Sequence, residues 1–279
     1  MNKLPIITII TVAYNAKSVI EKTINSIIGQ TYANIEYIII DGGSNDGTIE
    51  IIKKYSQHIK YWISERDKGI YDAMNKGIMA ANGDLINFMN AGDSFINKYT
   101  IEDIFKEYIN EDIFYGNIIR NFKNYQIRAT GITSNPPKII DFIGDTIHHQ
   151  AAFIKKDLFI KYGLYSLEYK LISDWIFFYE TIIKEKVNIK YVNKDVAFFE
   201  MNGASTIHAD IYNNERKSYL IKEIGEEFYS YLEELYKYNN CTIAKIGLKI
   251  KMILKKITII KSIHTTILYT KSKINKLIS

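Results

Sequence analysis

The sequence predicts an α/β fold with a mostly parallel sheet, and three observations lead to that prediction. Short apolar runs alternate with segments of helical periodicity through the first third of the 279-residue chain. The runs are apolar at nearly every position, as strands are when helices cover both faces of a parallel sheet. Each run is followed by polar residues or glycines, which is where open α/β sheets bind ligands. We therefore expect a sheet flanked by helices, with a ligand site at one edge.

Four strands and the helices between them account for the first 93 residues. The expected strands are residues 5–13, 35–40, 60–64 and 85–89. Ile20, Ile24 and Ile27 recur at helical spacing after the first strand, and similar periodicity follows in residues 49–55 and 70–81. Because a helix separates each strand from the next, neighbouring strands are expected to be parallel.

The pattern weakens after Asp93. We expect helices at residues 100–109, 173–185 and 212–238, and strands at residues 112–119, 125–130, 148–154, 188–193 and 196–201. The proline cluster Asn135-Pro-Pro-Lys138 must be a loop. The second half is therefore predicted to be mixed α/β structure that ends in a long polar helix.

The composition favours a cytoplasmic protein. Cys241 is the only cysteine, so the chain has no internal disulfide, and this favours a reducing compartment. The apolar start, LPIITIITVA, follows a single Lys and precedes no cleavage-like site, so we interpret it as a strand rather than a signal peptide. No apolar run reaches the roughly 18 residues that a membrane span needs.

The net charge of +5 conceals a basic tail on a mildly acidic body. Residues 237–279 contain ten Lys and no acidic residue, so the first 236 residues hold 26 basic and all 31 acidic side chains. A helix in the tail would place its lysines opposite an apolar stripe formed by Ile246, Ile250, Ile253, Leu254, Ile257 and Ile260. Two interpretations stay open: the tail binds the anionic inner face of the cytoplasmic membrane, or it packs on the body with a solvated basic face.

Polar residues follow all four N-terminal strands at the same edge of the expected sheet. They are Tyr14-Asn15, Asp41-Gly42-Gly43-Ser44, Ser64-Glu65-Arg66-Asp67 and Asn90-Ala91-Gly92-Asp93. Any single cluster is more often a loop than a site, but four clusters at one edge, three of them with an Asp, indicate a site. Crowded carboxylates repel one another, so the arrangement requires a cation or hydrogen-bond donors from a ligand.

Several common chemistries lack their motifs. No G-x-G-x-x-G follows the first strand and no G-x-x-x-x-G-K-[ST] occurs, so a Rossmann dehydrogenase and a P-loop enzyme are not supported. No G-x-S-x-G occurs and the lone cysteine lies in the tail, so nucleophilic catalysis is poorly supported. A nucleic-acid-binding module would use the basic tail, but the acidic sheet edge repels phosphodiester backbones. We expect no nucleic-acid partner.

Three segments resemble glycosyltransferase family 2. The run ITVAYNAKSVIEKTINSIIGQTYANIEYIIIDGGSNDGT is similar to the family's nucleotide-binding start, and SERDKGIYDAMNKGIMAANGDLINFMNAGD is similar to its centre. The later run HHQAAFIKKDLFIKYGLYSLEYKLISDWIFF resembles the acceptor half of the family's bacterial polysaccharide enzymes. The match covers about residues 5–205, with the three segments in the family's order. The resemblance implies a GT-A fold and an inverting transfer from a nucleotide-sugar, usually a UDP-sugar, to a hydroxyl of a glycan or lipid-linked acceptor in surface polysaccharide synthesis.

The resemblance also implies how the chain is divided. A GT-A catalytic domain would cover residues 1–210, with a nucleotide-binding half at residues 1–95 and an acceptor half at residues 96–210. Residues 211–279 would form a helical C-terminal extension that ends in the basic tail.

On the donor side, the resemblance implies roles for particular residues. Asp41 matches the carboxylate that accepts the base N–H of uracil. The segment beside the base matches Ala13, Tyr14 and Asn15. Asp67 and Asn75 match the segment near the ribose and diphosphate. The remaining donor-binding residues are Gly43, Ser44, Asn90 and Ala91.

On the acceptor side, Asp174 takes the place of the family's catalytic base. His148 and His149 are also expected there, although adjacent residues on a strand face opposite sides and one of the two can pack in the core. Trp175 is expected to offer an apolar face to a sugar ring, with core packing as an equal alternative. All four residues lie in the third of the matching segments.

One departure from the family pattern concerns the metal. Asn90-Ala91-Gly92-Asp93 occupies the place of the D-x-D-D metal motif, yet Asp93 is its only carboxylate. A divalent ion can take its remaining oxygen ligands from the donor diphosphate and water. We therefore expect Mn²⁺ or Mg²⁺, held largely by the donor and Asp93. The alternative is a catalytically weak or inactive relative that binds nucleotide-sugars.

Overall fold

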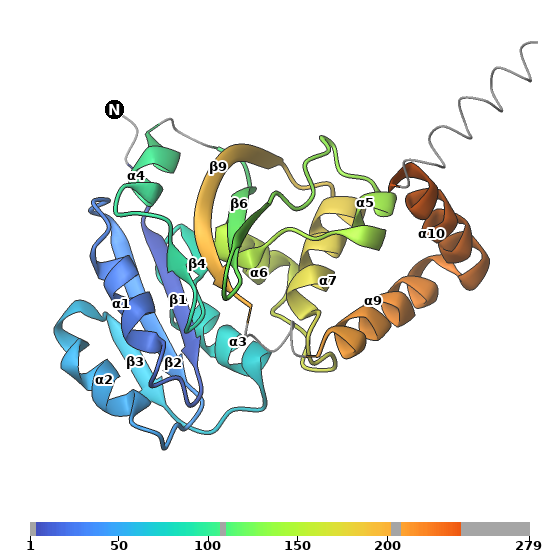
Figure 1. Cartoon of the computed structure of the whole chain (residues 1–279). Coiled ribbons are helices and arrows are strands. Elements are labelled where there is room, and N and C mark those ends of the chain that lie inside the picture. The colour runs from blue at the N-terminus through green and yellow to red at the C-terminus, as the bar shows by residue number, and fades with distance from the viewer. Residues whose placement is uncertain (1–3, 107–109, 202–207, 241–279) are drawn as a thin grey trace, which may run out of the picture. The chain divides into compact units, whose positions relative to one another are not determined.

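The computed structural model describes residues 4–106, 110–201 and 208–240 (Figure 1). The chain divides into two compact units, residues 1–223 and residues 224–279. The amphipathic helix expected at residues 246–260 lies outside the described residues, so both interpretations of the tail stay predictions. The functional division expected near residue 210 also stays a prediction.

A nine-stranded mixed sheet forms the centre of the first unit. Its strands are β1 (Ile7–Ala13), β2 (Ile35–Asp41), β3 (Tyr61–Ser64), β4 (Leu85–Phe88), β5 (Ser94–Phe95), β6 (Ile113–Asn121), β7 (Gln126–Ala129), β8 (Ala152–Lys155) and β9 (Ile189–Glu200). They lie in the order β3-β2-β1-β4-β8-β6-β9-β5, and β7 pairs with β6. The four N-terminal strands are parallel, whereas β8 joins them antiparallel to both β4 and β6. Figure 1 shows β9 as a long, curved strand beside β6, with which it pairs in parallel.

Helices flank this sheet. They are α1 (Ile20–Ile28), α2 (Thr48–Lys54), α3 (Ile70–Ala80), α4 (Thr100–Phe105), α5 (Ile139–Gly144), α6 (Lys156–Tyr162), α7 (Ser173–Tyr179) and α9 (Ala209–Ile224), with 3-10 turns η1 (Ser56–His58) and η2 (His149–Ala151) and a π-helix η3 (Glu180–Lys184). In the second unit, α10 covers Glu226–Asn240. None of the described helices is long and apolar enough to cross a membrane.

The apolar runs of the sequence become the buried core of the sheet. Ile9 and Ile39 on the strands, and Ile20, Ile24 and Ile27 on α1, are each at most 1% exposed and belong to one core cluster. Burying one such side chain stabilises the fold by roughly 1.5–3 kcal/mol. This packing fixes the strands, and with them the loops that follow the strands.

The strand register brings the four polar clusters together. Ala13 pairs with Asp41, and Asp41 pairs with Ser64. Beyond the end of β4, the backbone N–H of Ala91 still donates to the carbonyl of Val12 at 3.1 Å. The carboxyl ends of β1 to β4 therefore lie side by side, and the predicted α/β fold with its parallel N-terminal strands is confirmed.

The second half differs from the prediction in detail. The two short strands expected at residues 188–193 and 196–201 form the single strand β9, whose register with β6 shifts around Asn117. The helix expected at residues 173–185 changes from α7 to the π-helix η3, and the strand expected at 148–154 begins as the turn η2. The long helix expected at residues 212–238 is two helices, because Gly225 has a φ of +81°.

Candidate active site

A cavity of about 780 Å³ opens at the carboxyl ends of β1 and β4. Its walls come from both halves of the sheet, with β1 and β4 on one side and β6, η2 and α7 on the other. Six of the lining residues carry the polar groups that matter most for its chemistry: Tyr14, Asp67, Asn90, Asp93, His149 and Asp174. The cavity therefore joins part of the predicted donor set to the predicted base Asp174. Ala13, Tyr14, Asp67, Asn90 and Ala91 line it, whereas Asn15, Asp41 and Asn75 do not.

Asp41 is fully buried at the end of β2 and accepts hydrogen bonds from its own loop. The backbone N–H groups of Gly43 and Ser44 donate to Oδ2 at 3.1 and 2.9 Å, and the Ser44 hydroxyl donates to Oδ1 at 2.5 Å. The Ser64 hydroxyl, at the end of β3, also donates to Oδ2 at 2.6 Å. Gly43 has a φ of +84°, which a side chain would disfavour. Gly43 and Ser44 thus act on Asp41 and are not among the cavity-lining residues.

The loop after β1 is tied to the same region. Asn15 has a φ of +47°, and its backbone N–H donates to the Ser44 hydroxyl at 2.7 Å. Its side-chain oxygen accepts the N–H of Asn45 at 3.1 Å. Ala13 and Tyr14 line the cavity, and the Tyr14 side chain is 67% exposed. An exposed aromatic ring beside a buried carboxylate can stack on a planar base.

The structure separates the two residues that were expected near the ribose and diphosphate. Asp67 lines the cavity and accepts the N–H of Gly69 at 2.9 Å. Asn75 is 7% exposed and bonds twice to the backbone of Tyr165: its amide donates to the carbonyl at 2.8 Å and accepts the N–H at 2.9 Å. Asn75 is not among the lining residues, and its side chain joins α3 to the segment after α6. The structure thus gives the Asn75 side chain a packing role, and its interpretation as a donor ligand stays a prediction.

Asp93 is buried just after β4. It is 5% exposed, and burial raises its pKa to about 7, against the opposing effects of His149 and of the Glu200 N–H, which donates to Oδ1 at 3.2 Å. The preceding loop is held by Thr23 on α1, whose hydroxyl accepts the N–H of Gly92 and donates to the carbonyl of Asp93. A carboxylate in this setting gains from a nearby cation, because a cation favours its charged form.

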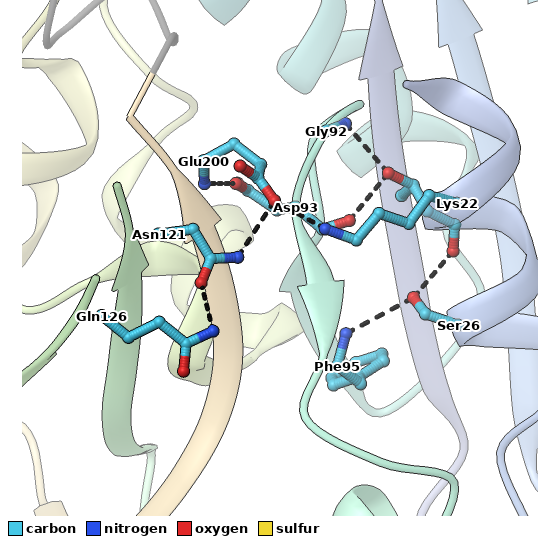
Figure 2. A network of polar contacts seen from close by, with 9 residues as sticks. Lys22, Ser26, Gly92, Asp93, Phe95, Asn121, Gln126 and Glu200 are labelled. Atoms are coloured by element: carbon cyan, nitrogen blue, oxygen red, sulfur yellow. Dashed lines mark hydrogen bonds and ion pairs between the residues drawn. The ribbon is translucent and has the colours of Figure 1, made fainter. Parts of the chain in front are cut away.

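A second carboxylate, Glu200 at the end of β9, lines the cavity next to Asp93. Figure 2 shows Glu200 between Lys22 of α1 and Asn121 of β6, which donate to Oε1 at 2.6 and 3.0 Å. Burial alone would raise the pKa of Glu200, but these two bonds hold it below its ordinary value. The sequence reasoning missed this residue, because no local pattern indicates that β9 ends beside the loop that follows β4.

Asp174 lies in the first turn of α7 with both carboxylate oxygens hydrogen-bonded. The Tyr71 hydroxyl donates to Oδ1 at 2.7 Å, and His149 Nδ1 lies 2.7 Å from Oδ2. Burial alone would raise the pKa of Asp174, but the bond and charge of His149 and the bond from Tyr71 hold it below the ordinary value of 3.8. Asp174 is therefore ionised at neutral pH.

His149 connects Asp174 to Asn90, which follows β4. An ionised carboxylate only accepts hydrogen bonds, so Nδ1 of His149 carries the proton toward Asp174. Nε2 lies 3.1 Å from the Asn90 amide nitrogen and accepts from it when the ring is neutral. Asn90 Oδ1 is left buried, without a partner among the described residues. The chain of contacts Tyr71–Asp174–His149–Asn90 joins the acceptor side of the cavity to the metal motif.

The other two acceptor-side residues have different surroundings. His148 lines the cavity and is 8% exposed, and burial, followed by the charges of Arg120 and His149, lowers its pKa to about 3. Trp175 is fully buried; its ring stacks on Tyr179 and lies under the guanidinium of Arg216. Trp175 is absent from the lining residues, so the sugar-facing interpretation is corrected and the core alternative holds.

The segment Asn90-Ala91-Gly92-Asp93, which follows β4, suits a divalent ion only in part. In the described part of the chain, no three His, Cys, Asp or Glu side chains are grouped to hold a metal. However, the unpartnered Oδ1 of Asn90 and the buried carboxylate of Asp93 both lie at the cavity. Oxygen ligands of this kind fit Mn²⁺ or Mg²⁺ if a diphosphate supplies the rest.

The fold is shared with solved glycosyltransferases. Staphylococcus aureus TarS (residues 1–349, in complex with UDP-GlcNAc) superposes with a TM-score of 0.63 at 16% identity, covering 83% of this chain and 71% of that one. The mannosyltransferase PcManGT of Pyrobaculum calidifontis, in complex with GDP-Man and Mn²⁺, gives a TM-score of 0.56 at 13% identity, covering 91% and 81%. The predicted GT-A fold is confirmed.

Sequence comparison identifies the family. The profile described as Glycosyl transferase family 2 matches residues 8–163. A PGL/p-HBAD biosynthesis glycosyltransferase of Mycobacterium tuberculosis is 28% identical over 213 residues, which cover 74% of this chain and 81% of the relative. An uncharacterized glycosyltransferase of the same species is 30% identical over 200 residues, with 69% and 75% covered. The chain therefore belongs to glycosyl transferase family 2 and is a glycosyltransferase.

Proposed function

We propose that this glycosyltransferase moves a sugar from a UDP-sugar to a hydroxyl of a glycan or lipid-linked acceptor, with inversion at the sugar carbon. One observation carries the proposal. The ionised carboxylate of Asp174 lies in the same cavity as Asp67 and Asp93, which follow the strands of the donor half. A base and a nucleotide site that share one cavity can bring an acceptor hydroxyl and a donor together.

On the donor side, Asp41 is the proposed acceptor of the uracil N–H. Four hydrogen bonds from its loop and from Ser64 orient this carboxylate, and three of them end on Oδ2. Oδ1 accepts only one of the four and so retains a lone pair for the base. Tyr14 would cover the base, and Asp67 would accept hydroxyls of the ribose.

Asp93 and the Oδ1 atom of Asn90 would hold Mn²⁺ or Mg²⁺ together with the donor diphosphate. When bound, the ion neutralises charge that develops on the leaving diphosphate. The chain's own residues hold the remaining charges in place: Lys22 and Asn121 fix Glu200, and Thr23 fixes the loop around Gly92.

Asp174 would take the proton of the attacking hydroxyl. A sugar hydroxyl is a poor nucleophile until a positioned base accepts its proton in the transition state. Tyr71 and His149 hold the two carboxylate oxygens at fixed positions, which keeps the base oriented before the acceptor binds. A single base acting on a hydroxyl that attacks opposite the leaving diphosphate inverts the sugar carbon.

A screen of UDP-, GDP- and dTDP-sugars tests this function. With Mn²⁺ present, we expect one or more UDP-sugars to raise the unfolding temperature and to be hydrolysed slowly without acceptor. The same nucleotides with Asp41→Ala serve as the matched control, since that variant lacks the proposed base contact. If no nucleotide-sugar stabilises the wild-type protein, the proposal is wrong.

The basic tail is proposed to bind the anionic inner face of the cytoplasmic membrane, where a lipid-linked acceptor would be found. Its ten lysines and its apolar stripe support this proposal. Flotation with anionic vesicles tests it by comparing the full chain with a form that ends at Tyr238. Equal flotation of the two forms would rule out the membrane role and leave packing on the body.

A further inference from the structure

Arg120, on β6, is the only Lys or Arg among the described residues that line the cavity. Its side chain is partly buried, and its guanidinium makes no hydrogen bond or ion pair with another described residue. A guanidinium that is partly removed from water without a partner is unfavourable, because lost hydration is not replaced. Such a group is therefore expected to serve an anion that arrives with a ligand.

Arg128 and Arg216, by contrast, each donate to acceptors within the protein, although Nε of Arg216 is buried without a partner among the described residues. Arg128, on β7, pairs with Asp195 and donates to Asn193 at 2.7 Å. Arg216, on α9, donates to the carbonyls of Phe142 and Asp145. Arg120 thus differs from its counterparts in having no protein acceptor.

The acids of the cavity do not neutralise Arg120, because they have other partners. Glu200 is held by Lys22, and Asp174 is held by Tyr71 and His149. Asp145, which does not line the cavity, interacts with Arg120 by charge, but no hydrogen bond or ion pair joins the two, so no described acid hydrogen-bonds the guanidinium.

His148 supplies a second polar group on the same wall. It is 8% exposed, and its Nε2 is buried without a hydrogen-bond partner among the described residues. Its low pKa, caused first by burial and then by the charge of Arg120, keeps the ring neutral, and both residues line the same cavity. A neutral imidazole can donate one hydrogen bond beside a guanidinium.

We propose that Arg120 and His148 form a subsite for a phosphate group carried by the acceptor, so that the acceptor is a phosphate-bearing glycan or lipid. The planar guanidinium suits two phosphate oxygens at once, and the imidazole suits a third. The position of the pair argues for the acceptor rather than the donor: Arg120 is on β6 and His148 precedes η2, whereas the proposed diphosphate site follows β4. This inference rests on the proposed function of the same cavity.

Calorimetric titration tests the subsite with two probes that differ in one phosphate. Wild-type protein saturated with UDP and Mn²⁺ is titrated with glucose 1-phosphate and, separately, with methyl glucoside. Charge-assisted hydrogen bonds predict that the phosphate improves affinity about 10- to 100-fold. Arg120→Gln should abolish the difference, Arg120→Lys should retain part of it, and the control Arg128→Gln should leave it unchanged.

The affinity for UDP separates the acceptor from the donor. Arg120→Gln should bind UDP as the wild type does, and should unfold at no lower temperature, because the guanidinium has no partner to lose. A matching loss of UDP affinity would assign Arg120 to the donor diphosphate and overturn the proposal. Equal affinity of the wild type for the two probes, with UDP still bound, would overturn the phosphate subsite alone. Failure of the wild type to bind any nucleotide would overturn the proposed function as well.

Discussion

The two halves of the sheet build the site in different ways. In the donor half, β1 to β4 are parallel, and Asp41 is held chiefly by Gly43 and Ser44, two and three residues further along the chain. In the acceptor half, Asp174 is held by Tyr71 and His149, which lie 103 and 25 residues away. The donor site therefore depends on local loops at one sheet edge, whereas the acceptor site depends on contacts between distant segments.

This difference has a functional consequence. Substitutions in the acceptor half should impair transfer and leave nucleotide binding unchanged, because the loops around Asp41 do not depend on α7. Substitutions after β4 should affect both transfer and nucleotide binding, because Asn90 and Asp93 lie where the two halves meet at the cavity.

The largest effect is expected for Asp174→Asn. Asn lacks a carboxylate to accept the proton, so transfer should fall about 10²–10⁴-fold. Tyr71 can still donate to the amide oxygen, so UDP affinity should stay within about twofold of wild type. Transfer assays and calorimetry on the same preparation check both statements, and near wild-type transfer would remove Asp174 from the mechanism.

The pH dependence of stability gives a control for that variant. The pKa of Asp174 is lower in the folded protein than its ordinary value of 3.8. Its contribution to stability is therefore present above that value and is lost as the pH falls through the lower, folded pKa. The difference in unfolding free energy between wild type and Asp174→Asn should be constant from pH 5 to 8 and shrink below pH 4.

Asp93→Ala is expected to have the next largest effect. Loss of the carboxylate weakens metal binding at the diphosphate, and transfer should fall about 10²–10³-fold. Asn90→Ala should do less harm, since an amide oxygen is a weaker ligand than a carboxylate. Activity at several Mn²⁺ concentrations distinguishes the two variants, and activity that is unchanged by EDTA would contradict any metal role.

Two substitutions of His149 can each preserve one of its two contacts. His149→Ala should lower transfer about 10- to 100-fold, as loss of an orienting residue commonly does. His149→Asn can keep the bond to Asp174, and His149→Gln can keep the bond to Asn90. If the main role of His149 is to orient Asp174, His149→Asn should retain more of the transfer rate than His149→Gln. The reverse order would show that its contact with Asn90 matters more.

The smallest effect on activity is expected for Asn75→Ala. The change leaves the N–H and carbonyl of Tyr165 without their partners, which should cost about 1–3 kcal/mol of stability. UDP affinity should change less than twofold, because both polar atoms of the Asn75 amide are bonded to the backbone of Tyr165. Denaturant unfolding and calorimetry check this, and a tenfold loss of UDP affinity at unchanged stability would support Asn75 as a donor ligand.

The sequence was sufficient for the strands of the donor half because their signals are local. Ile-rich runs followed by Asp41 or Asn90 predict both the strand and the site at its end, and the parallel register then brings these ends together. Glu200 and its partner Lys22 could not be found in this way, because 178 residues separate them.

The errors in the acceptor half also have physical reasons. Asp174 and Trp175 are adjacent, but consecutive residues on a helix point about 100° apart. Asp174 faces the cavity, while Trp175 faces the core against Tyr179. The sequence alone does not reveal which of the two side chains faces the cavity and which faces the core. The strands expected at residues 188–193 and 196–201 likewise left a break between them, but residues 194–195 lie within β9 where its register with β6 shifts.

The stereochemistry of donor hydrolysis tests the central claim most directly. Wild-type protein with Mn²⁺ and the α-linked UDP-sugar identified in the screen is followed by ¹H NMR from the first minutes, before the free sugar mutarotates. A water molecule deprotonated by Asp174 and attacking opposite the diphosphate releases the β anomer first, and Asp174→Asn should slow that release. Initial release of the α anomer would contradict a single-displacement mechanism with Asp174 as base.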